Sequence, residues 1–270
     1  MKVGVSRNAR RANFFESSIV DRKSSILVDG VLNLFFPEDC LSCGASIARR
    51  QDRGVCDLCW EKALNLRILP PWCPCCGLPF QQRLIDDSHL CGPCAIHLPS
   101  FSGARSFGYY MSELRQMIHS LKFRGRRDLS GLFAPLLASV FHEAWTREDV
   151  DLIVPVPLHP KRQRERTFNQ AAMLARDLAR LLALPYRERA LKRVRYTTPQ
   201  VGLSDAERLL NIRQAFVAQP ELSAGKRILL IDDVMTTGAT VAGASQALLE
   251  GGARRVSVLT LARAVPGMDL

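Results

Sequence analysis

The 270-residue sequence lacks any apolar run of the length that a membrane-spanning helix requires, which is about 20 residues. Its longest apolar stretch, residues 25–37, is interrupted by Asp29, Gly30 and Asn33. The same stretch lies too far from the start for a secretory signal and has no convincing cleavage site. We therefore expect no membrane span and a cytoplasmic location, with an amphipathic helix at residues 25–37.

Cysteine is absent before position 40 and after position 94. Between these limits the chain has four Cys-x2-Cys pairs, with Cys75 left over. The paired residues are Cys40 and Cys43, Cys56 and Cys59, Cys73 and Cys76, and Cys91 and Cys94. Two thiolates from one tight turn can bind the same Zn²⁺, and two such turns complete a tetrahedral site. Without a secretory signal this pattern favours zinc over a disulfide scaffold or an iron–sulfur cluster.

Eight thiolates suit two closed four-cysteine sites, which would be structural because no coordination position stays open. Sequential pairing would join the first two Cys-x2-Cys units and the last two, whereas an interleaved arrangement satisfies the same count. The sequence does not choose between them, and we expect one or two structural zinc ions. Gly44 and Gly77 follow the second cysteine of their pairs, as the sharp turn of a zinc knuckle requires.

The residues after Pro99 alternate between strand and helix patterns. Strands are expected at 104–110, 151–155, 228–231 and 256–261. Helices are expected at 113–121, 129–145, 169–184 and 206–213, with a last helix ending at Glu250. This order predicts an α/β fold with a doubly wound, mainly parallel sheet of about five strands. We expect a tail and amphipathic helix at 1–39, a cysteine-rich zinc module at 40–100 and the α/β domain at 101–270.

The net charge of +11 is concentrated in the middle of the chain. Residues 101–200 hold 18 lysines and arginines against 9 acidic residues. A basic segment of this kind attracts polyanions such as nucleic acid or pyrophosphate. A solvated basic surface explains the same charge equally well, because charge alone does not identify a partner.

Residues 228–241 carry the most specific chemical pattern. Four apolar residues, 228–231, predict a buried parallel strand, and Asp232 and Asp233 follow it. A hydroxyl-rich turn with one glycine then precedes an alanine-rich helical pattern. Ligands of parallel α/β sheets bind outside the carboxyl ends of the strands, and a helix N-terminus offers N–H groups to phosphate. The segment therefore predicts a sugar-phosphate site, with an ordinary strand–turn–helix as the alternative.

This segment resembles the 5-phosphoribosyl-1-pyrophosphate (PRPP) motif of type I phosphoribosyltransferases. The resemblance implies that Asp232 and Asp233 hold the 2′- and 3′-hydroxyls of the ribose. It also implies that the turn wraps the 5′-phosphate through its backbone N–H groups and hydroxyls. The residues of the turn are Thr236, Thr237, Gly238, Ala239 and Thr240. Gly238 would permit a close backbone approach and an unusual φ.

An ordered set of motifs resembles the ComF (ComFC/GntX) family, in which a zinc module precedes a type I phosphoribosyltransferase domain. Besides the cysteine pairs and the PRPP motif, the set contains Phe36-Pro37, Leu121-Lys122-Phe123-x-Gly125, Val154-Pro155-Val156-Pro157-Leu158, Arg166-x-Phe168-Asn169-Gln170, Thr197-x2-Gln200 and Arg208-x2-Asn211. The resemblance covers about residues 32–261. Thr167 departs from it, because the family usually has glycine there, and Thr167 would be strained if that position needs positive φ.

Phosphoribosyl transfer releases pyrophosphate, so the site must neutralise a highly charged leaving group, usually with Mg²⁺ and basic residues. We expect Arg162 and the backbone of residues 156–159 to form the pyrophosphate loop, and Lys122 to reach a phosphate as a point charge. Surface solvation is the alternative for both side chains.

Residues 193–215 resemble the flexible hood that closes over PRPP in this fold. The hood residues that we single out are Thr197, Gln200, Arg208 and Asn211. A plain connecting segment with one short helix is the alternative.

Two functions agree with these expectations. The family resemblance implies a PRPP-binding protein that supports the handling of incoming single-stranded DNA in natural transformation, with single-stranded DNA and other competence proteins as partners. The alternative is an active, Mg²⁺-dependent phosphoribosyltransferase that acts on an unidentified small-molecule acceptor. The sequence has no recognisable base-binding hood for a purine, pyrimidine or orotate. PRPP-binding regulators are also known in this fold, so the fold does not select between the two functions.

Overall fold

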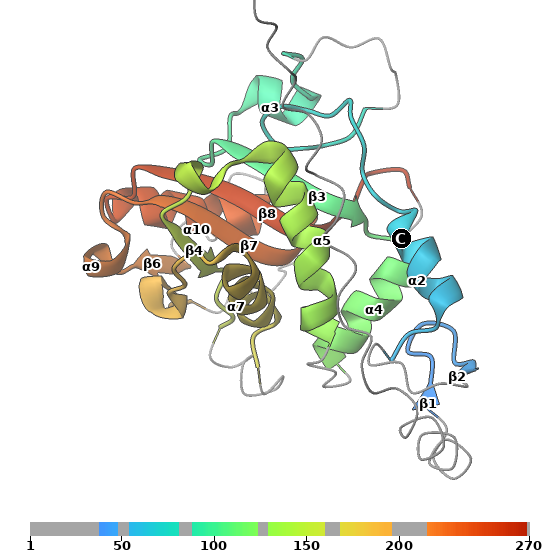
Figure 1. The fold of residues 1–270 in the computed structure, drawn as a ribbon. Coiled ribbons are helices and arrows are strands. Elements are labelled where there is room, and N and C mark those ends of the chain that lie inside the picture. Colours follow the sequence, from blue (N-terminus) through green and yellow to red (C-terminus); the bar gives the residue numbers. More distant parts are fainter. Residues whose placement is uncertain are drawn as a thin grey trace, which may run out of the picture.

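A four-stranded parallel sheet forms the centre of the protein in the computed structural model (Figure 1). The structure describes residues 38–47, 54–80, 88–123, 129–159, 168–195 and 215–268. The strands lie in the order β3 (Gly103–Tyr109), β8 (Arg255–Arg263), β7 (Arg227–Met235) and β4 (Leu152–Pro155). Every neighbouring pair is parallel, so the carboxyl ends of all four strands meet at one edge of the sheet.

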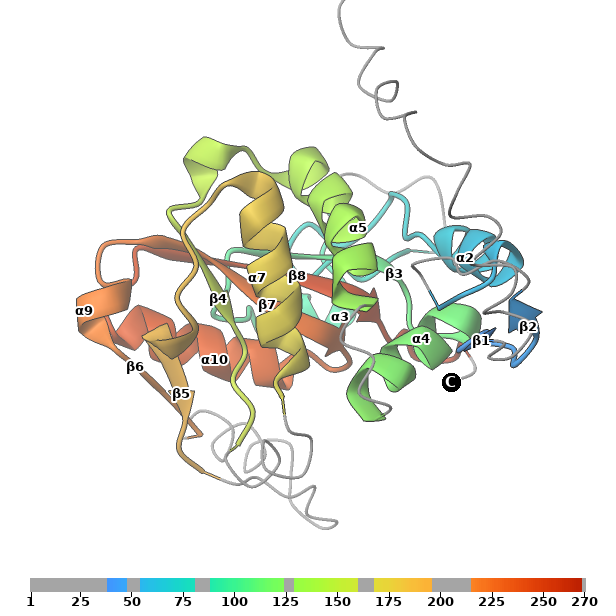
Figure 2. The same ribbon diagram turned by 60° about the horizontal axis from the view of Figure 1, so that its bottom comes forward.

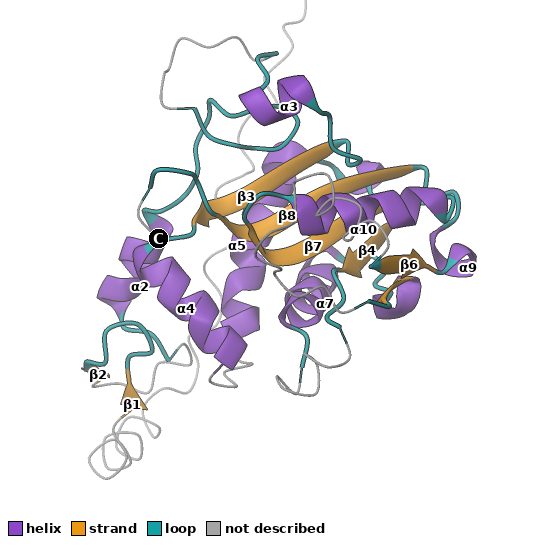
Figure 3. Cartoon of the chain, turned by 180° about the vertical axis from the view of Figure 1, so that it is seen from behind, coloured by secondary structure: helices purple, strands orange, loops and turns teal. Residues whose placement is uncertain are grey.

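Both faces of the sheet are covered by helices, which is why its strands are nearly continuous apolar runs. Successive side chains of β7 point to opposite faces. Leu229 and Ile231 pack in the cluster that contains residues of α5 (Leu129–Ala144) and α7 (Gln170–Leu182), whereas Ile228 and Leu230 pack with α10 (Ala239–Glu250). Figures 2 and 3 show these two layers on either side of the sheet. The doubly wound parallel fold is therefore confirmed.

Two features of the sheet differ from the prediction. The described residues form four parallel strands rather than about five, because the next neighbour of β4 makes only one bridge, between Ile153 and Tyr186. The strand predicted to end at residue 231 continues to Met235, because β8 supplies ladder partners as far as Arg263. Asp232 and Asp233 consequently lie inside β7 rather than after it.

A small antiparallel hairpin is formed by segments on either side of the undescribed residues 196–214. Its strands are β5 (Leu191–Arg193) and β6 (Phe216–Ala218). The short helix α9 (Pro220–Ser223) leads from β6 towards β7. One-turn 3₁₀ helices precede β4 and β5, at Arg147–Asp149 and Glu188–Ala190. The hairpin brings Arg193 close enough to affect the ionisation of Asp232.

The cysteine-rich residues form two separate knuckles on the α/β body (Figure 1). The first includes β1 (Glu38–Asp39), β2 (Ser46–Ile47) and α2 (Asp57–Leu64), and its apolar residues share a cluster with those of α4 (Ser112–Phe123). The second includes α3 (Gly92–Ile96), and its cysteines share a cluster with the opposite face of the sheet. Each knuckle therefore contributes to a core that it shares with the α/β body.

The helices predicted at 113–121, 129–145 and 169–184 are confirmed as α4, α5 and α7, with small differences at their ends. The helices predicted at 25–37 and 206–213 lie outside the described residues. Among the helices that the structure describes, none has both the length and the apolar composition to cross a membrane.

Candidate functional site

The carboxyl end of β7 leads through a short turn into α10. Thr236 and Thr237 follow the strand and are exposed, and Gly238 is the N-cap of the helix. The N–H of Ala242 donates to the carbonyl oxygen of Gly238 at 2.9 Å and so begins the helical pattern. The first N–H groups of a helix have no intrahelical acceptor, and the helix dipole is positive at this end. The turn therefore presents an anion-binding helix terminus beside the end of β7.

Gly238 has the left-handed φ of +84° that its place in the sequence led us to expect. A Cβ at this position would lie 2.7 Å from Cε of Met235, so the methionine side chain lies directly against the turn. The hydroxyl oxygen of Thr237 accepts a hydrogen bond from the N–H of Ala239 at 3.4 Å. The left-handed backbone angle therefore favours glycine at position 238, and a larger residue there would also displace the flexible end of the Met235 side chain.

The acidic pair on β7 is in contact with a lysine from α4. Nζ of Lys122 lies 2.9 Å from Oδ1 of Asp233, and these side chains are only 16% and 13% exposed. Lys122 is in the last turn of α4. The N–H of Asp233 donates to Oδ1 of Asp232 at 2.9 Å. The structure therefore brings together three residues that the sequence placed in one site from two distant segments.

Asp232 has a strongly shifted ionisation. Burial raises its pKa, and the neighbouring charge of Asp233 raises it further, to about 7. The hydrogen bond from the N–H of Asp233 and the charges of Lys122 and Arg193 oppose this shift. Near neutral pH the carboxyl group can therefore either accept or donate a hydrogen bond, which suits a ligand that carries hydroxyl groups.

The start of α7 holds the neighbouring strand end and α4 in place. Oδ1 of Asn169 accepts from the N–H of Ala171 at 3.1 Å and caps the helix, while its Nδ2 donates to the carbonyl oxygen of Val156 at 3.0 Å. Gln170 donates from Nε2 to the carbonyl oxygen of Lys122 at 3.4 Å. The Asn-Gln pair of the sequence motif thus links the residues after β4 to the turn that carries Lys122.

Several predicted site residues lie outside the described residues. They are Arg162, Thr197, Gln200, Arg208 and Asn211. The sequence analysis did not single out Arg193 or Arg263, although a cation two residues beyond the apolar strand pattern 256–261 could have pointed to Arg263. In the fold Arg263 is buried at the end of β8, beside Met235.

The first cysteine site is made of Cys40, Cys43, Cys56 and Cys59, whose sulfur atoms all lie within 4.8 Å of one another. The N–H of Cys56 donates to Sγ of Cys40 at 3.3 Å, as N–H groups do in zinc knuckles. Burial raises the pKa of the Cys40 thiol, but backbone hydrogen bonds, first from Cys56, outweigh it and lower that pKa to about 6. The pKa of Cys59 is instead raised to about 12, first by burial and then by its crowded neighbours.

The second cysteine site is made of Cys73, Cys76, Cys91 and Cys94, which are all buried and also lie within 4.8 Å of one another. The N–H of Cys91 donates to Sγ of Cys73 at 3.5 Å. Four thiols this close cannot all ionise without a cation among them, and four sulfur ligands at tetrahedral reach suit Zn²⁺. The sites join the Cys-x2-Cys pairs sequentially, which answers the question that the sequence left open. Both sites are closed and therefore structural.

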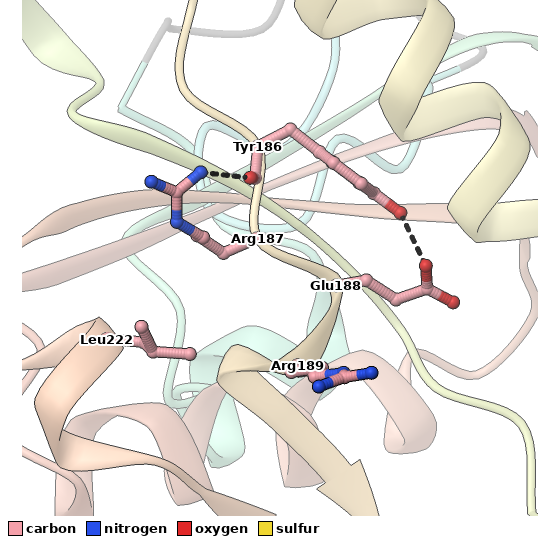
Figure 4. Close-up of a pocket in the computed structure, with 5 residues that line it drawn as sticks. All are labelled: Tyr186, Arg187, Glu188, Arg189 and Leu222. Atoms are coloured by element: carbon pink, nitrogen blue, oxygen red, sulfur yellow. Dashed lines mark hydrogen bonds between the residues drawn. The ribbon is translucent and has the colours of Figure 1, made fainter.

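A separate hollow of about 480 Å³ lies at the edge of the protein beside α9 (Figure 4). Tyr186, Arg187, Glu188, Arg189 and Leu222 line it. The hydroxyl of Tyr186 donates to Oε2 of Glu188 at 3.1 Å, and Nη1 of Arg187 donates to the carbonyl oxygen of Tyr186 at 2.9 Å. Tyr186 is thus bonded to both Glu188 and Arg187, and neither the acidic pair nor the turn before α10 lines the hollow.

Comparison with known proteins agrees with this arrangement. Residues 31–95 match the model of the double zinc ribbon domain, and residues 169–266 match that of the phosphoribosyl transferase domain. The DNA utilization protein YhgH of Escherichia coli O157:H7 is 36% identical over 78% of this chain and 90% of its own length. Competence protein F of Haemophilus influenzae is 32% identical over 85% of this chain and 99% of its own.

A third relative, competence protein ComFC of Bacillus subtilis, is 30% identical over 79% of this chain and 86% of its own length. These matches extend over both the cysteine-rich and the α/β residues, in the same order along the chain. This protein therefore belongs to the ComF family of phosphoribosyltransferase-like proteins, in which a double zinc ribbon precedes a phosphoribosyltransferase domain.

Proposed function

We propose that this protein binds PRPP at the carboxyl end of β7 and supports the handling of incoming single-stranded DNA in natural transformation. The observation that carries the first part is the acidic pair near the end of β7, separated by two residues from the anion-binding turn. In the proposed complex, Asp232 and Asp233 accept hydrogen bonds from the ribose hydroxyls. The N–H groups and hydroxyls of residues 236–240 bind the 5′-phosphate at the N-terminus of α10.

The ion pair between Lys122 and Asp233 supports a role for the lysine in this complex. A ribose hydroxyl that donates to Asp233 would compete with the ammonium group, which lies 2.9 Å away. Lys122 would then turn towards the pyrophosphate, which a flexible point charge can follow. Arg193, whose charge already acts on Asp232, would add to the positive field at the same place.

Mg²⁺ is proposed to enter with PRPP rather than to occupy a site made by the protein alone. This ion retains several waters and is usually held by one or two carboxylates together with substrate phosphates. The acidic pair offers such carboxylates beside the proposed position of the pyrophosphate. Arg162 and the hood residues between 193 and 215 complete the proposed site, as the sequence motifs suggest.

Calorimetric titration with PRPP in the presence of Mg²⁺ tests this site. We expect saturable binding to the zinc-loaded protein and none to a variant that carries Asp232→Asn and Asp233→Asn. Asp151→Asn is the matched control, because it removes a carboxylate at the opposite end of the neighbouring strands β4 and β7. Normal PRPP binding by the double variant would refute the assignment of the acidic pair.

The proposed role in DNA handling draws on the competence and DNA-utilization relatives and on the basic segment 101–200. It places the protein in the cytoplasm, where incoming single strands and other competence proteins would be its partners. Fluorescence anisotropy with labelled single-stranded DNA, at 50 and 200 mM salt and with or without PRPP, tests direct contact. Charge-driven binding should weaken at the higher salt for every DNA sequence alike. Binding unaffected by salt would contradict a role for the basic segment.

The alternative function, transfer of phosphoribose to a small-molecule acceptor, is favoured by the cations beside the acidic pair. Lys122 and Arg193, whose charges act on the acidic pair, would neutralise the departing pyrophosphate in this reaction. An assay of pyrophosphate release from PRPP and Mg²⁺, with mixed nucleobases and amines as acceptors, distinguishes turnover from binding. Release that depends on both Lys122 and an acceptor would establish the enzyme.

A further inference from the structure

A buried arginine joins the second cysteine site to the last residue of β7. Arg263 ends β8 and is 5% exposed. Its Nη1 donates to the carbonyl oxygen of Cys76 at 2.8 Å, and its Nη2 lies 3.6 Å from Sγ of the same cysteine. Nη1 also lies 2.9 Å from Sδ of Met235. One guanidinium group therefore contacts both a metal-ligand turn and the strand that carries the acidic pair.

Met235 extends this contact to the turn before α10. Its side chain is buried, and its Cε lies 2.7 Å from the position that a Cβ of Gly238 would occupy. The backbone on both sides is held as well, because Met235 pairs with Arg263 in the β7–β8 ladder and accepts a hydrogen bond from the N–H of Ala264 at 3.0 Å. Protein interiors are close-packed, so a displaced guanidinium would move the methionine and, with it, the turn.

The charge of Arg263 makes this arrangement sensitive to the metal. Within the described part of the chain, the guanidinium contacts go to a carbonyl oxygen and two sulfur atoms rather than to a carboxylate. A buried cation needs a compensating negative charge close by. A zinc ion bound by four thiolates carries a net negative charge, and Cys76 is one of those thiolates. The occupied zinc site would thus hold the guanidinium in place.

We propose that Arg263 is a positioning residue that couples zinc at the Cys73, Cys76, Cys91 and Cys94 site to PRPP at the turn before α10. This inference rests on the proposed PRPP site. Zinc holds Arg263, Arg263 holds Met235, and Met235 supports the turn at Gly238. Because coupling between two binding sites is reciprocal, PRPP must also strengthen the retention of zinc at this site.

The first test compares Arg263→Met with the unaltered protein, both loaded with zinc. PRPP affinity is measured by calorimetry with Mg²⁺, and zinc content is measured after equilibration with increasing concentrations of a chelator. We expect the variant to bind PRPP on the order of tenfold more weakly, which is the usual size of such coupling. We also expect PRPP to shift one of the two zinc-release steps of the unaltered protein to higher chelator concentration, and to shift neither step of the variant.

Met235→Leu breaks the same chain of contacts at a second point without altering a residue of the zinc site. It removes the sulfur that faces Arg263 and preserves most of the apolar volume. Its PRPP affinity should fall, and PRPP should no longer protect its zinc. This variant keeps the proposal testable if Arg263→Met does not fold.

Arg105→Met is the matched control. Arg105 also lies beside the second cysteine site, where its Nη1 donates to the carbonyl oxygen of Pro74 at 3.1 Å and its guanidinium lies over the ring of Trp72. Its described contacts do not include Met235. Loss of this arginine should weaken zinc retention, but PRPP should bind zinc-loaded protein normally and still protect the zinc.

The outcomes separate this inference from the function on which it rests. If the unaltered protein does not bind PRPP, the proposed function fails, and the coupling fails with it. If it binds PRPP but PRPP leaves zinc retention unchanged, or if Arg263→Met and Met235→Leu bind PRPP normally, only the coupling is wrong. If Arg105→Met loses as much PRPP affinity as Arg263→Met, the effect comes from general damage to the knuckle, and the specific role of Arg263 is refuted.

Discussion

At the scale of single residues, the candidate site combines a left-handed glycine with a carboxyl group of altered ionisation. Gly238 is left-handed and lies against Met235, and Asp232 is half-buried beside another carboxylate. Ionising Asp232 costs stability because its pKa is raised, and perturbed pKa values cluster at functional sites. Both the glycine and the carboxyl group lead to a substitution whose effect can be measured.

Gly238→Ala should lower the free energy of unfolding by about 1–2 kcal/mol and weaken PRPP binding. The added methyl group would adopt an unfavourable φ and press on Cε of Met235. Gly267→Ala is the control, because Gly267 has a similar φ of +81° with no atom within 4 Å of the added Cβ. Urea unfolding and PRPP calorimetry of both variants separate the effect of the unfavourable φ from that of the contact with Met235. Equal loss of PRPP affinity in both would show that the contact with Met235 has no effect.

Asp232→Asn should stabilise the protein at pH 8 and have little effect at pH 4. The folded state raises the pKa of Asp232 from 3.8 to about 7, so ionising it opposes folding. The penalty is absent below pH 4, grows as the pH rises between 4 and 7, and is complete above 7. Urea unfolding of both proteins across this range measures the difference.

Asp151→Asn serves as the control of opposite sign. Its ion pair with Arg227, at 2.6 Å, holds the pKa of Asp151 well below its ordinary value. This carboxylate therefore stabilises the fold at neutral pH, and its contribution is lost as the pH falls below 3.8. A stability difference for Asp232→Asn that shrinks as the pH rises would contradict the assignment of its raised pKa.

At the scale of secondary-structure elements, the site depends on how helix ends meet strand ends. The N-terminus of α10 follows β7, the last turn of α4 reaches Asp233, and the first residues of α7 bind the segments next to both. These contacts are made by caps and terminal turns rather than by helix interiors. Loosening one cap should therefore affect both stability and the geometry of the site.

Asn169→Ala should lower the free energy of unfolding by about 1–2 kcal/mol, as removal of a buried helix cap does. The side chain is 7% exposed, and it bonds both the N–H of Ala171 and the carbonyl oxygen of Val156. PRPP affinity should fall too, because the segment after β4 loses its anchor. Thr146→Ala, at an exposed 3₁₀ cap that precedes the amino end of β4, is the control and should change stability less. Chemical denaturation and calorimetry measure both effects.

At the scale of the whole molecule, the two knuckles and the α/β body share their apolar clusters. Ile47 and Val55 of the first knuckle pack in the cluster that contains α4, and the cysteines of the second pack with the opposite face of the sheet. The division at residue 100 that we proposed from composition thus runs between segments in close contact. Loss of zinc should therefore lower the stability of the α/β body as well as that of the knuckles.

The double variant Cys43→Ser and Cys56→Ser should retain one zinc ion per chain and unfold at a lower temperature. Both residues belong to the first site, so the second site stays complete. An interleaved arrangement would place the two cysteines in different sites, and the same variant would then lose both ions. Elemental analysis counts the zinc, and scanning calorimetry should show a single transition because the cores are shared.

The sequence by itself determined the elements whose signals are local. Cys-x2-Cys spacing is a property of one turn, and it identified all eight cysteines of the two clusters. Apolar periodicity located β3, β4, β8 and the main helices, and the Asp-Asp and Thr-Thr-Gly pattern located the turn between β7 and α10. Asn169 was recognised as a cap because its side chain bonds its own helix.

The tertiary structure decided everything that depends on partners distant in the chain. The length of β7 follows from the ladder that β8 offers, and the pairing of the cysteines follows from where the two knuckles pack. The ion pair of Lys122 with Asp233 joins residues from α4 and β7, and the contacts of Arg263 join Cys76 to Met235. No local pattern records such distances, because they are set by the packing of whole layers. The sequence therefore determined the chemical groups of this protein, and the fold determined which of them act together.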